Sequence, residues 1–211
     1  MSEINILSID FDWIMEPCIE FYNDKATQSI ALDELLKLSP NIYIKPDYQK
    51  FSTLVTYATN IAQTLPNAKN VYFGVNHQEI ISAIENIWDI KDKSYHIYNI
   101  DHHHDCGYGV TTLQEINKQG LTCGNWLAYC KNLKSYTWIN NKNSHIEMPD
   151  EVFQKLSKYT FSSDINIINY INFDYIFVCA SPGWVPSELS PLYTLLQFNI
   201  NAVLPEEKER C

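Results

Sequence analysis

Metal-competent side chains follow three short apolar runs of this sequence. The runs are Asn5–Ile9, Val71–Val75 and Tyr95–Ile100. The side chains that follow them are Asp10, Asp12, His77, Asp101, His103 and Asp105. Carboxylate and imidazole together make a ligand set suited to manganese or a similar first-row divalent ion. The sequence therefore predicts a metal site built from three separate stretches.

The candidate ligands alternate along the chain in the first and third stretches. Alternate residues of an extended chain point to the same side, so each set is expected to face one cavity. The intervening His102 and His104 are then expected to point the other way. A lone Asp-x-Asp is more often a turn or helix cap, and a lone histidine an ordinary polar residue. A metal site is favoured because such residues follow three separate apolar runs.

Charge predicts the number of ions. The four carboxylates are those of Asp10, Asp12, Asp101 and Asp105. Bare carboxylates so close repel one another and resist joint ionisation. One divalent cation leaves a deficit of two charges, whereas two cations balance all four, and His77 and His103 would complete the ligand shells without changing the charge. Two ions ~3.5–4 Å apart can share a hydroxide of near-neutral pKa. The sequence thus favours a dinuclear hydrolase.

Strands alternating with helices are expected to position these residues. Five near-continuous apolar runs predict buried strands at Asn5–Ile9, Val71–Val75, Tyr95–Ile100, Tyr136–Ile139 and Tyr175–Ala180. Apolar stripes predict helices at Phe51–Leu65 and Ile80–Trp88, and Ser190-Pro191 is typical of a helix start. This pattern predicts an α/β fold: one domain over residues 1–204, with a mostly parallel sheet, helices on both faces, and a frayed tail at 205–211. Ligands of such sheets bind beyond the carboxyl ends of the strands.

Composition excludes several classes of protein. The chain has 211 residues, 45% hydrophobic and 19% charged, with a net charge of −10. This balance argues against nucleic-acid binding and mildly favours cationic partners. No membrane span or signal peptide is expected, so we expect a cytoplasmic protein. Nucleotide-binding glycine motifs and a GxSxG elbow are absent from the sequence. The cysteines are expected to be free, and are Cys18, Cys106, Cys123, Cys130, Cys179 and Cys211.

The motifs resemble those of the arginase/ureohydrolase superfamily. Ser8–Asp12 resembles its Ser-Phe-Asp-Val-Asp element, Asp101–Asp105 its Asp-Ala-His-x-Asp element, and Val75–His77 its Gly-Asp-His element. Thr122–Asn125 is faintly similar to its Ser-Gly-Asn substrate loop. The short length and the Gly-Asn-Trp and Ser-Pro-Gly-Trp-Val-Pro segments look most like compact peptide arginases. Those enzymes convert peptidyl arginine to ornithine in pathways that modify ribosomally made peptides.

This resemblance implies two Mn²⁺ ions and an arginine-containing precursor peptide as substrate. It implies that Asp10 and Asp101 bridge the ions, that His77 and Asp105 complete one shell, and that His103 and Asp12 complete the other. Asp105 would also hold a bridging hydroxide by a hydrogen bond. That hydroxide would attack the guanidinium carbon, and collapse of the tetrahedral intermediate would release urea and an amine.

The chain also departs from the family pattern. Its Asp-x-Asp element comes first rather than last, which implies a permuted or rewired strand order. The usual third acidic residue is displaced to Glu16, and Trp126-Leu127 stands where a histidine is expected. The proton shuttle therefore has only His104 as a candidate.

Substrate recognition needs a carboxylate, because a guanidinium presents planar donors that match it. Glu188 is our candidate, although acids are also favoured in the first turn of a helix. Trp184 and Trp126 could shape the pocket or stack on the cation, or belong to the core. Asn125, in the loop segment, and Glu16 complete the predicted substrate-binding set.

Two other functions stay open. One is an amide hydrolase of the deacetylase type, whose fold is related and whose site normally holds one zinc. The other is a non-catalytic protein that binds basic peptides through its acidic surface. The sequence also leaves open whether a ureohydrolase substrate would be free arginine, agmatine or a peptide residue, although the short chain favours an open site and a peptide.

Overall fold

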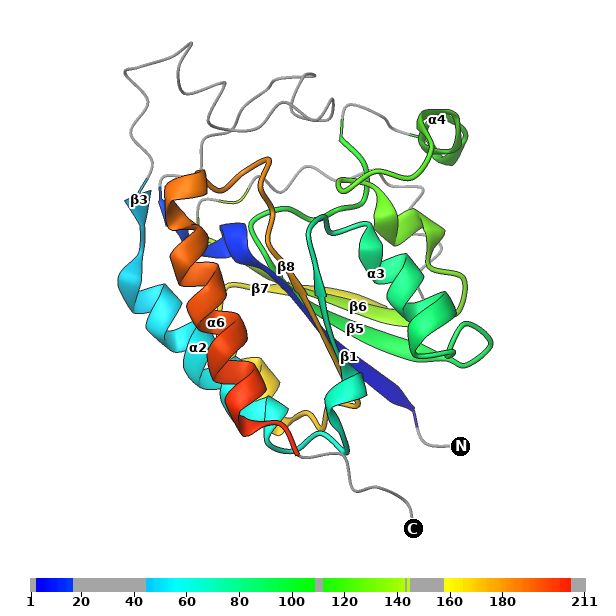
Figure 1. The fold of residues 1–211 in the computed structure, drawn as a ribbon. Coiled ribbons are helices and arrows are strands. Elements are labelled where there is room, and N and C mark those ends of the chain that lie inside the picture. The colour runs from blue at the N-terminus through cyan, green and yellow to red at the C-terminus, as the bar shows by residue number, and fades with distance from the viewer. Residues whose placement is uncertain (1–2, 17–44, 109–111, 143, 145–157, 206–211) are drawn as a thin grey trace.

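A six-stranded parallel sheet forms the centre of the protein (Figure 1). The computed structural model describes residues 3–16, 45–108, 112–142, 144 and 158–205. The strands lie in the order β4-β8-β1-β5-β6-β7. Their bounds are β1 Ile4–Asp10, β4 Val71–Gly74, β5 Tyr95–Asp101, β6 Leu133–Asn140, β7 Lys158–Ser162 and β8 Tyr175–Cys179. This arrangement confirms the predicted α/β fold class.

β1 lies in the interior of the sheet and is parallel to both of its neighbours. Ile9 pairs with Ile100 of β5 and with Val178 of β8. All three side chains are buried, as the near-continuous apolar runs predicted. The five expected strands are present with ends shifted by up to three residues. The edge strand β7 was not predicted, because its short sequence alternates polar and aromatic residues without a buried apolar run.

Helices cover both faces of the sheet (Figure 1). The helix α2 (Tyr48–Ala62) and the helix α6 (Ser190–Val203) pack together on one face. On the other face lie α3 (Glu79–Ser82), which continues as the π-helical turn η4 (Ala83–Ile87), and α4 (Leu113–Gln119) with the 3-10 turn η5 (Trp126–Tyr129). The three predicted helices are confirmed, and α4 was not predicted. The shorter elements are η1 Phe11–Ile14, β2 Met15–Glu16, β3 Lys45–Pro46, η3 Ala68–Asn70, η6 Ile165–Tyr170 and η7 Ser187–Leu189.

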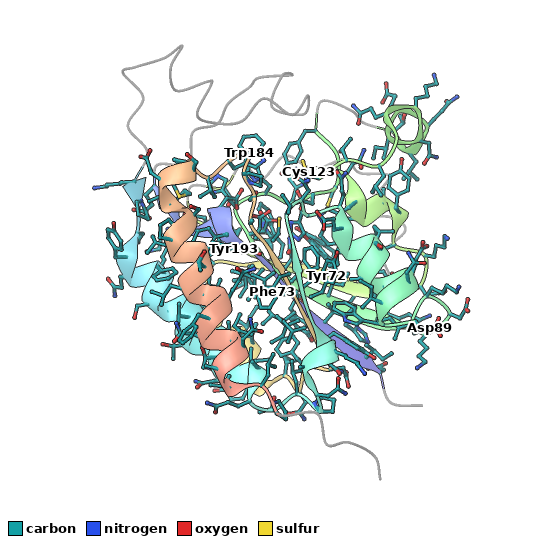
Figure 2. The ribbon with its side chains drawn as sticks, viewed as in Figure 1. Tyr72, Phe73, Asp89, Cys123, Trp184 and Tyr193 are labelled. Carbon is teal, nitrogen blue, oxygen red and sulfur yellow. The ribbon has the colours of Figure 1, made fainter. Side chains whose placement is uncertain are left out.

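Alternating strand residues divide the core into two clusters. Leu7 and Ile9 of β1 join the cluster under α2 and α6, whereas Ile6 joins the cluster under α3 and η5. Figure 2 likewise shows Tyr72 and Phe73 on opposite sides of β4. Ser8 and Asp10 share the side of Ile6 because strand residues alternate. Polar side chains therefore occupy the carboxyl end of the face that carries α3 and η5.

The structure also bears on two predictions from the sequence, the lack of a membrane-spanning helix and the free state of the cysteines. None of the helices in the described part of the chain has both the length and the apolar character needed to cross a bilayer. Cys106 and Cys179 are buried and free, and Cys123 and Cys130 are free and half-buried. Cys18, Cys211 and all of the predicted tail except Pro205 lie outside the described residues.

Candidate metal centre

The six predicted metal ligands come together at the carboxyl edge of the sheet. Asp10 is the last residue of β1 and Asp101 is the last residue of β5, while His77 follows β4 by three residues. All of the six except His103 are buried, and the side chain of His103 is 17% exposed. Three carboxyl ends of parallel strands thus meet at one place, as expected for this kind of sheet.

The first ligand group is centred on His77. Its Nδ1 lies 3.0 Å from Oδ2 of Asp10, 3.1 Å from Oδ2 of Asp101 and 2.9 Å from Oδ2 of Asp105. Ligand atoms of Asp10, His77 and Asp101 all lie within 4.8 Å of one another. Because one ring nitrogen carries at most one proton, it cannot satisfy three carboxylates by hydrogen bonding. We call these four residues group A.

The second group is centred on His103. Its Nδ1 lies 2.8 Å from Oδ2 of Asp12 and 3.8 Å from Oδ1 of Asp101. Ligand atoms of Asp12, Asp101 and His103 also lie within 4.8 Å of one another. We call these three residues group B. The two groups share Asp101, which turns one oxygen toward each.

Hydrogen bonds hold the shared carboxylate in this orientation. The Asn99 amide donates to Oδ2 of Asp101 at 2.9 Å, and the backbone N–H of His103 donates to Oδ1 at 2.7 Å. Asn99 and Asp101 alternate on β5 and so share a face. The indole N–H of Trp138 donates to the backbone carbonyl of Asp101 at 3.0 Å. The carboxylate is therefore fixed by its surroundings before any ligand binds.

The backbone reaches this geometry in a different way from the predicted extended chain. Asp12 lies in η1, and its backbone N–H donates to Oδ1 of Asp10, which caps that turn. Asp105 has a φ of +53°, in the left-handed region that non-glycine residues seldom adopt. Both stretches therefore turn sharply after the strand ends. The ligands converge because of these turns. The prediction that they would face one cavity by alternating along an extended chain was therefore wrong.

Ser8 orients His77 through the ring nitrogen that does not face the carboxylates. No role was predicted for Ser8. The hydroxyl of Ser8 lies 2.7 Å from Nε2 of His77, and both side chains are buried. The His77 ring stacks on Phe177 at 5.6 Å between ring centroids. A metal-binding histidine commonly uses its second ring nitrogen in this way, which fixes the tautomer. The signal was present in the sequence, since Ser8 and Asp10 alternate on one strand.

The electrostatics of the centre favour retained protons or bound cations. Burial raises the pKa of Asp12 to about 7, and the charge of Asp10 adds to the effect. Burial, with the charges of Asp105 and Asp10, raises the pKa of Asp101 to about 8. Burial opposes the charged form of His103, but the attraction of Asp12, Asp101 and Asp105 outweighs it and raises its pKa to about 9. Without a cation, the site therefore holds protons at neutral pH.

The residues present fit a divalent cation. Two buried atoms of the centre, Oδ2 of Asp12 and Nδ1 of His77, face other ligand atoms of the cluster at 2.8–3.1 Å, but in the described part of the chain they make no well-formed hydrogen bond. Buried polar atoms without a well-formed hydrogen bond cost free energy, and a metal ion would satisfy these two. The donors are carboxylate oxygens and imidazole nitrogens, as manganese and similar ions prefer. The nearby Cys123 does not change this set, because burial and the charges of Asp105 and Asp10 raise its pKa to about 12.

Aromatic rings stand beside group B. The Trp184 ring lies 4.4 Å from the His103 ring, and the Tyr108 ring meets His103 edge-on at 5.9 Å. Trp184 is presented by a turn in which its backbone N–H donates to the carbonyl of Ser181, a residue with a φ of +53°. Figure 2 shows Trp184 and Cys123 at the same end of the molecule, above the sheet. Tyr108 was not predicted as a site residue.

The other predicted residues have different surroundings from those expected. Glu16 pairs with Lys50 at 2.5 Å, so its carboxylate already has a cation. Asn125 is buried, and its amide closes its own loop through Thr122 and Gly120. Neither contact points to a substrate. The pairing with Lys50 could not be predicted from the sequence, because the two residues are 34 positions apart.

His104 and Trp126 are both fully buried. The His104 ring stacks on Tyr108 at 4.4 Å and its Nδ1 accepts the backbone N–H of Cys106, and His104 belongs to neither group A nor group B. Burial argues against proton transfer to solvent by His104 and against direct substrate contact by Trp126. Glu188 is exposed in η7, and its role in substrate binding stays a prediction.

Comparisons with known proteins do not identify this site. Neither a protein-family model, nor a curated protein, nor a solved structure matches the chain. The function of this chain is therefore inferred from its residues and their geometry.

Proposed function

We propose that this protein is a dinuclear, manganese-dependent hydrolase of the arginase type. Its substrate would be an arginine residue in a peptide and its products ornithine and urea. The observation that carries the proposal is the shared Asp101, which presents one oxygen to group A and the other to group B. A carboxylate in that position suits a pair of ions better than a single one, because four carboxylates need two divalent cations for balance.

The chemistry follows from the type of site. Two bound divalent ions would supply Lewis acidity and a water activated near neutral pH. In the proposed reaction, a water would add to the guanidinium carbon, the bond from this carbon to the side-chain nitrogen would break, and a proton would pass to the departing amine. One water is consumed, and urea and ornithine are formed. The resemblance of Ser8–Asp12 and Asp101–Asp105 to ureohydrolase elements supports this reaction class.

The aromatic rings beside group B suit a flat cation. A guanidinium can stack on an indole face, and such contacts contribute about 0.5–2 kcal/mol. Trp184 is half-buried next to His103, so part of its surface is accessible beside the metal ligands. The protein's net charge of −10 also favours a cationic substrate over an anionic one. We assign Trp184 to substrate recognition, with Glu188 as the candidate carboxylate.

The decisive assay supplies Mn²⁺ to metal-free protein and offers an arginine-containing peptide and free arginine separately. We expect urea release and a peptide mass change from arginine to ornithine, both abolished by a chelator. Turnover of free arginine alone would overturn the peptide assignment. Absence of urea from every guanidino substrate, with amide cleavage in its place, would support the deacetylase-type alternative. Peptide binding that survives chelation, without any turnover, would support the non-catalytic alternative.

A further inference from the structure

We propose that Trp126 is a positioning residue that holds Asp105 in group A and thereby sets the affinity of that group for its metal ion. This inference rests on the metal centre of the proposed function. It replaces the direct substrate contact expected of Trp126 from the sequence.

Two contacts of the Trp126 side chain lead to group A. Its indole N–H donates to Oδ2 of Asp105, the same oxygen that lies 2.9 Å from Nδ1 of His77. The Trp126 ring also packs against the His77 ring, with 4.9 Å between centroids and a 36° tilt. A donor to a carboxylate forms a charge-assisted hydrogen bond, which is stronger than a bond between neutral groups. One fully buried side chain therefore contacts two of the four residues of group A.

A second hydrogen bond ties Asp105 to the same turn. The backbone N–H of Leu127, in η5, donates to the carbonyl of Asp105 at 3.2 Å. The turn itself is anchored by Asn125, whose amide accepts from the Thr122 N–H and donates to the Gly120 carbonyl. Asp105 needs such support, because a left-handed backbone is costly for a residue other than glycine. Thus η5 fixes both the backbone and the carboxylate of Asp105.

Group B has no equivalent support from Trp126. The backbone carbonyl of Asp12 accepts the N–H of Met15, and its Oδ1 accepts the backbone N–H of His102 at 3.3 Å. The two groups share only Asp101. Loss of the Trp126 N–H is therefore expected to weaken group A and to leave group B nearly unchanged. Changes to hydrogen-bond partners of metal ligands typically reduce metal affinity about 10–100-fold.

The test is Mn²⁺ titration of metal-free Trp126→Phe, followed by calorimetry and by the electron paramagnetic resonance of bound Mn²⁺. Trp88→Phe is the matched control, because Trp88 is also buried and its indole nitrogen has no hydrogen bond in the described residues. Wild type and Trp88→Phe should bind two ions with the signal of a coupled pair. Trp126→Phe should bind one ion as before and the other about 10–100-fold more weakly, with the signal of an isolated ion.

The outcomes separate this inference from the proposed function. Wild-type protein that binds no metal overturns both. Two ions in wild type with unchanged affinities in Trp126→Phe, or equal weakening of both ions, overturns the role of Trp126 alone. If Trp126→Phe does not fold, indole N–H resonances of the wild type decide: the Trp126 proton, identified through its contact with Tyr136, should be the most downfield and should shift when Zn²⁺ is added. A Trp126 proton that does not respond to the metal contradicts the role.

Discussion

The hydroxyl of Ser8 lies 2.7 Å from Nε2 of His77, while Nδ1 of the same ring faces three carboxylate oxygens. The imidazole is thus held between a neutral hydrogen-bonding partner and a strongly negative cluster. With Nε2 protonated and donating to Ser8, Nδ1 keeps a lone pair for a cation. This relationship makes Ser8 a sensitive place to test the metal centre without changing a ligand.

Ser8→Ala is expected to reduce Mn²⁺ affinity about 10-fold, because the ring of His77 loses the contact that fixes its tautomer. The measurement is a calorimetric Mn²⁺ titration of the metal-free variant. Ser135→Ala is the matched control, since Ser135 makes a similar contact with His96 at 2.6 Å but neither residue belongs to group A or B. Equal affinities in wild type and Ser8→Ala would contradict the proposed orientation of His77.

Asp12→Asn should remove the ion of group B and keep that of group A, because Asp12 contributes only to group B. Urea release should fall at least about 100-fold, since loss of one ion removes several kcal/mol of transition-state stabilisation. Metal content per chain, measured together with urea release, checks both parts. Asp164→Asn serves as the control, because Asp164 caps η6 and belongs to neither ligand group. Full activity with a single ion would exclude a two-ion mechanism.

Stability of the metal-free protein should fall as pH rises from about 4 to about 9. Asp12 and Asp101 keep protons up to pH values of about 7 and 8 when folded, whereas unfolded aspartate releases its proton near pH 3.9. Above that value the unfolded state is increasingly favoured. The raised pKa of His103 acts in the same direction, because its stabilisation is complete below pH 6.5 and is lost as the pH passes about 9.

Thermal unfolding between pH 5 and 9 measures this trend. Mn²⁺ should raise the melting temperature more at high pH, because the ion replaces the bound protons. Asp101→Asn should flatten the metal-free trend, since one of the protonated carboxyl groups is gone. A metal-free protein that becomes more stable from pH 6 to 9 would show that the buried carboxylates are not held as described.

Trp184→Leu should raise the KM for a guanidino peptide about 2–30-fold, corresponding to a lost cation–π contact of about 0.5–2 kcal/mol, with a smaller effect on kcat. Metal content should not change, because Trp184 contacts His103 only through its ring. Tyr170→Leu is the control, as the Tyr170 side chain is 90% exposed outside the site. An unchanged KM would remove Trp184 from substrate recognition.

The fold could be predicted because buried parallel strands have a simple signature. β1, β5 and β8 are near-continuous apolar runs, and a polar residue ends two of them. The carboxyl ends of such strands must lie at one edge, so the meeting of Asp10, His77 and Asp101 could be predicted as well. The strand β7 could not, because an edge strand needs no continuous apolar run.

The details of the site depended on turns and on distant partners. Asp105 reaches His77 through a left-handed backbone, which the spacing of the motif does not reveal. Lys50 neutralises Glu16 across a long stretch of chain, and Trp126 turns its indole nitrogen inward to Asp105. Sequence patterns indicate which face a residue occupies. They do not indicate which neighbour it will meet there.

The most direct test is the number of manganese ions bound by the wild-type protein. Metal-free chain is saturated with Mn²⁺, freed of excess ion, and analysed for metal content and for its electron paramagnetic resonance spectrum. Two ions per chain with the signal of a coupled pair is the predicted result, because groups A and B share one carboxylate. One isolated ion, or none, would contradict a dinuclear centre.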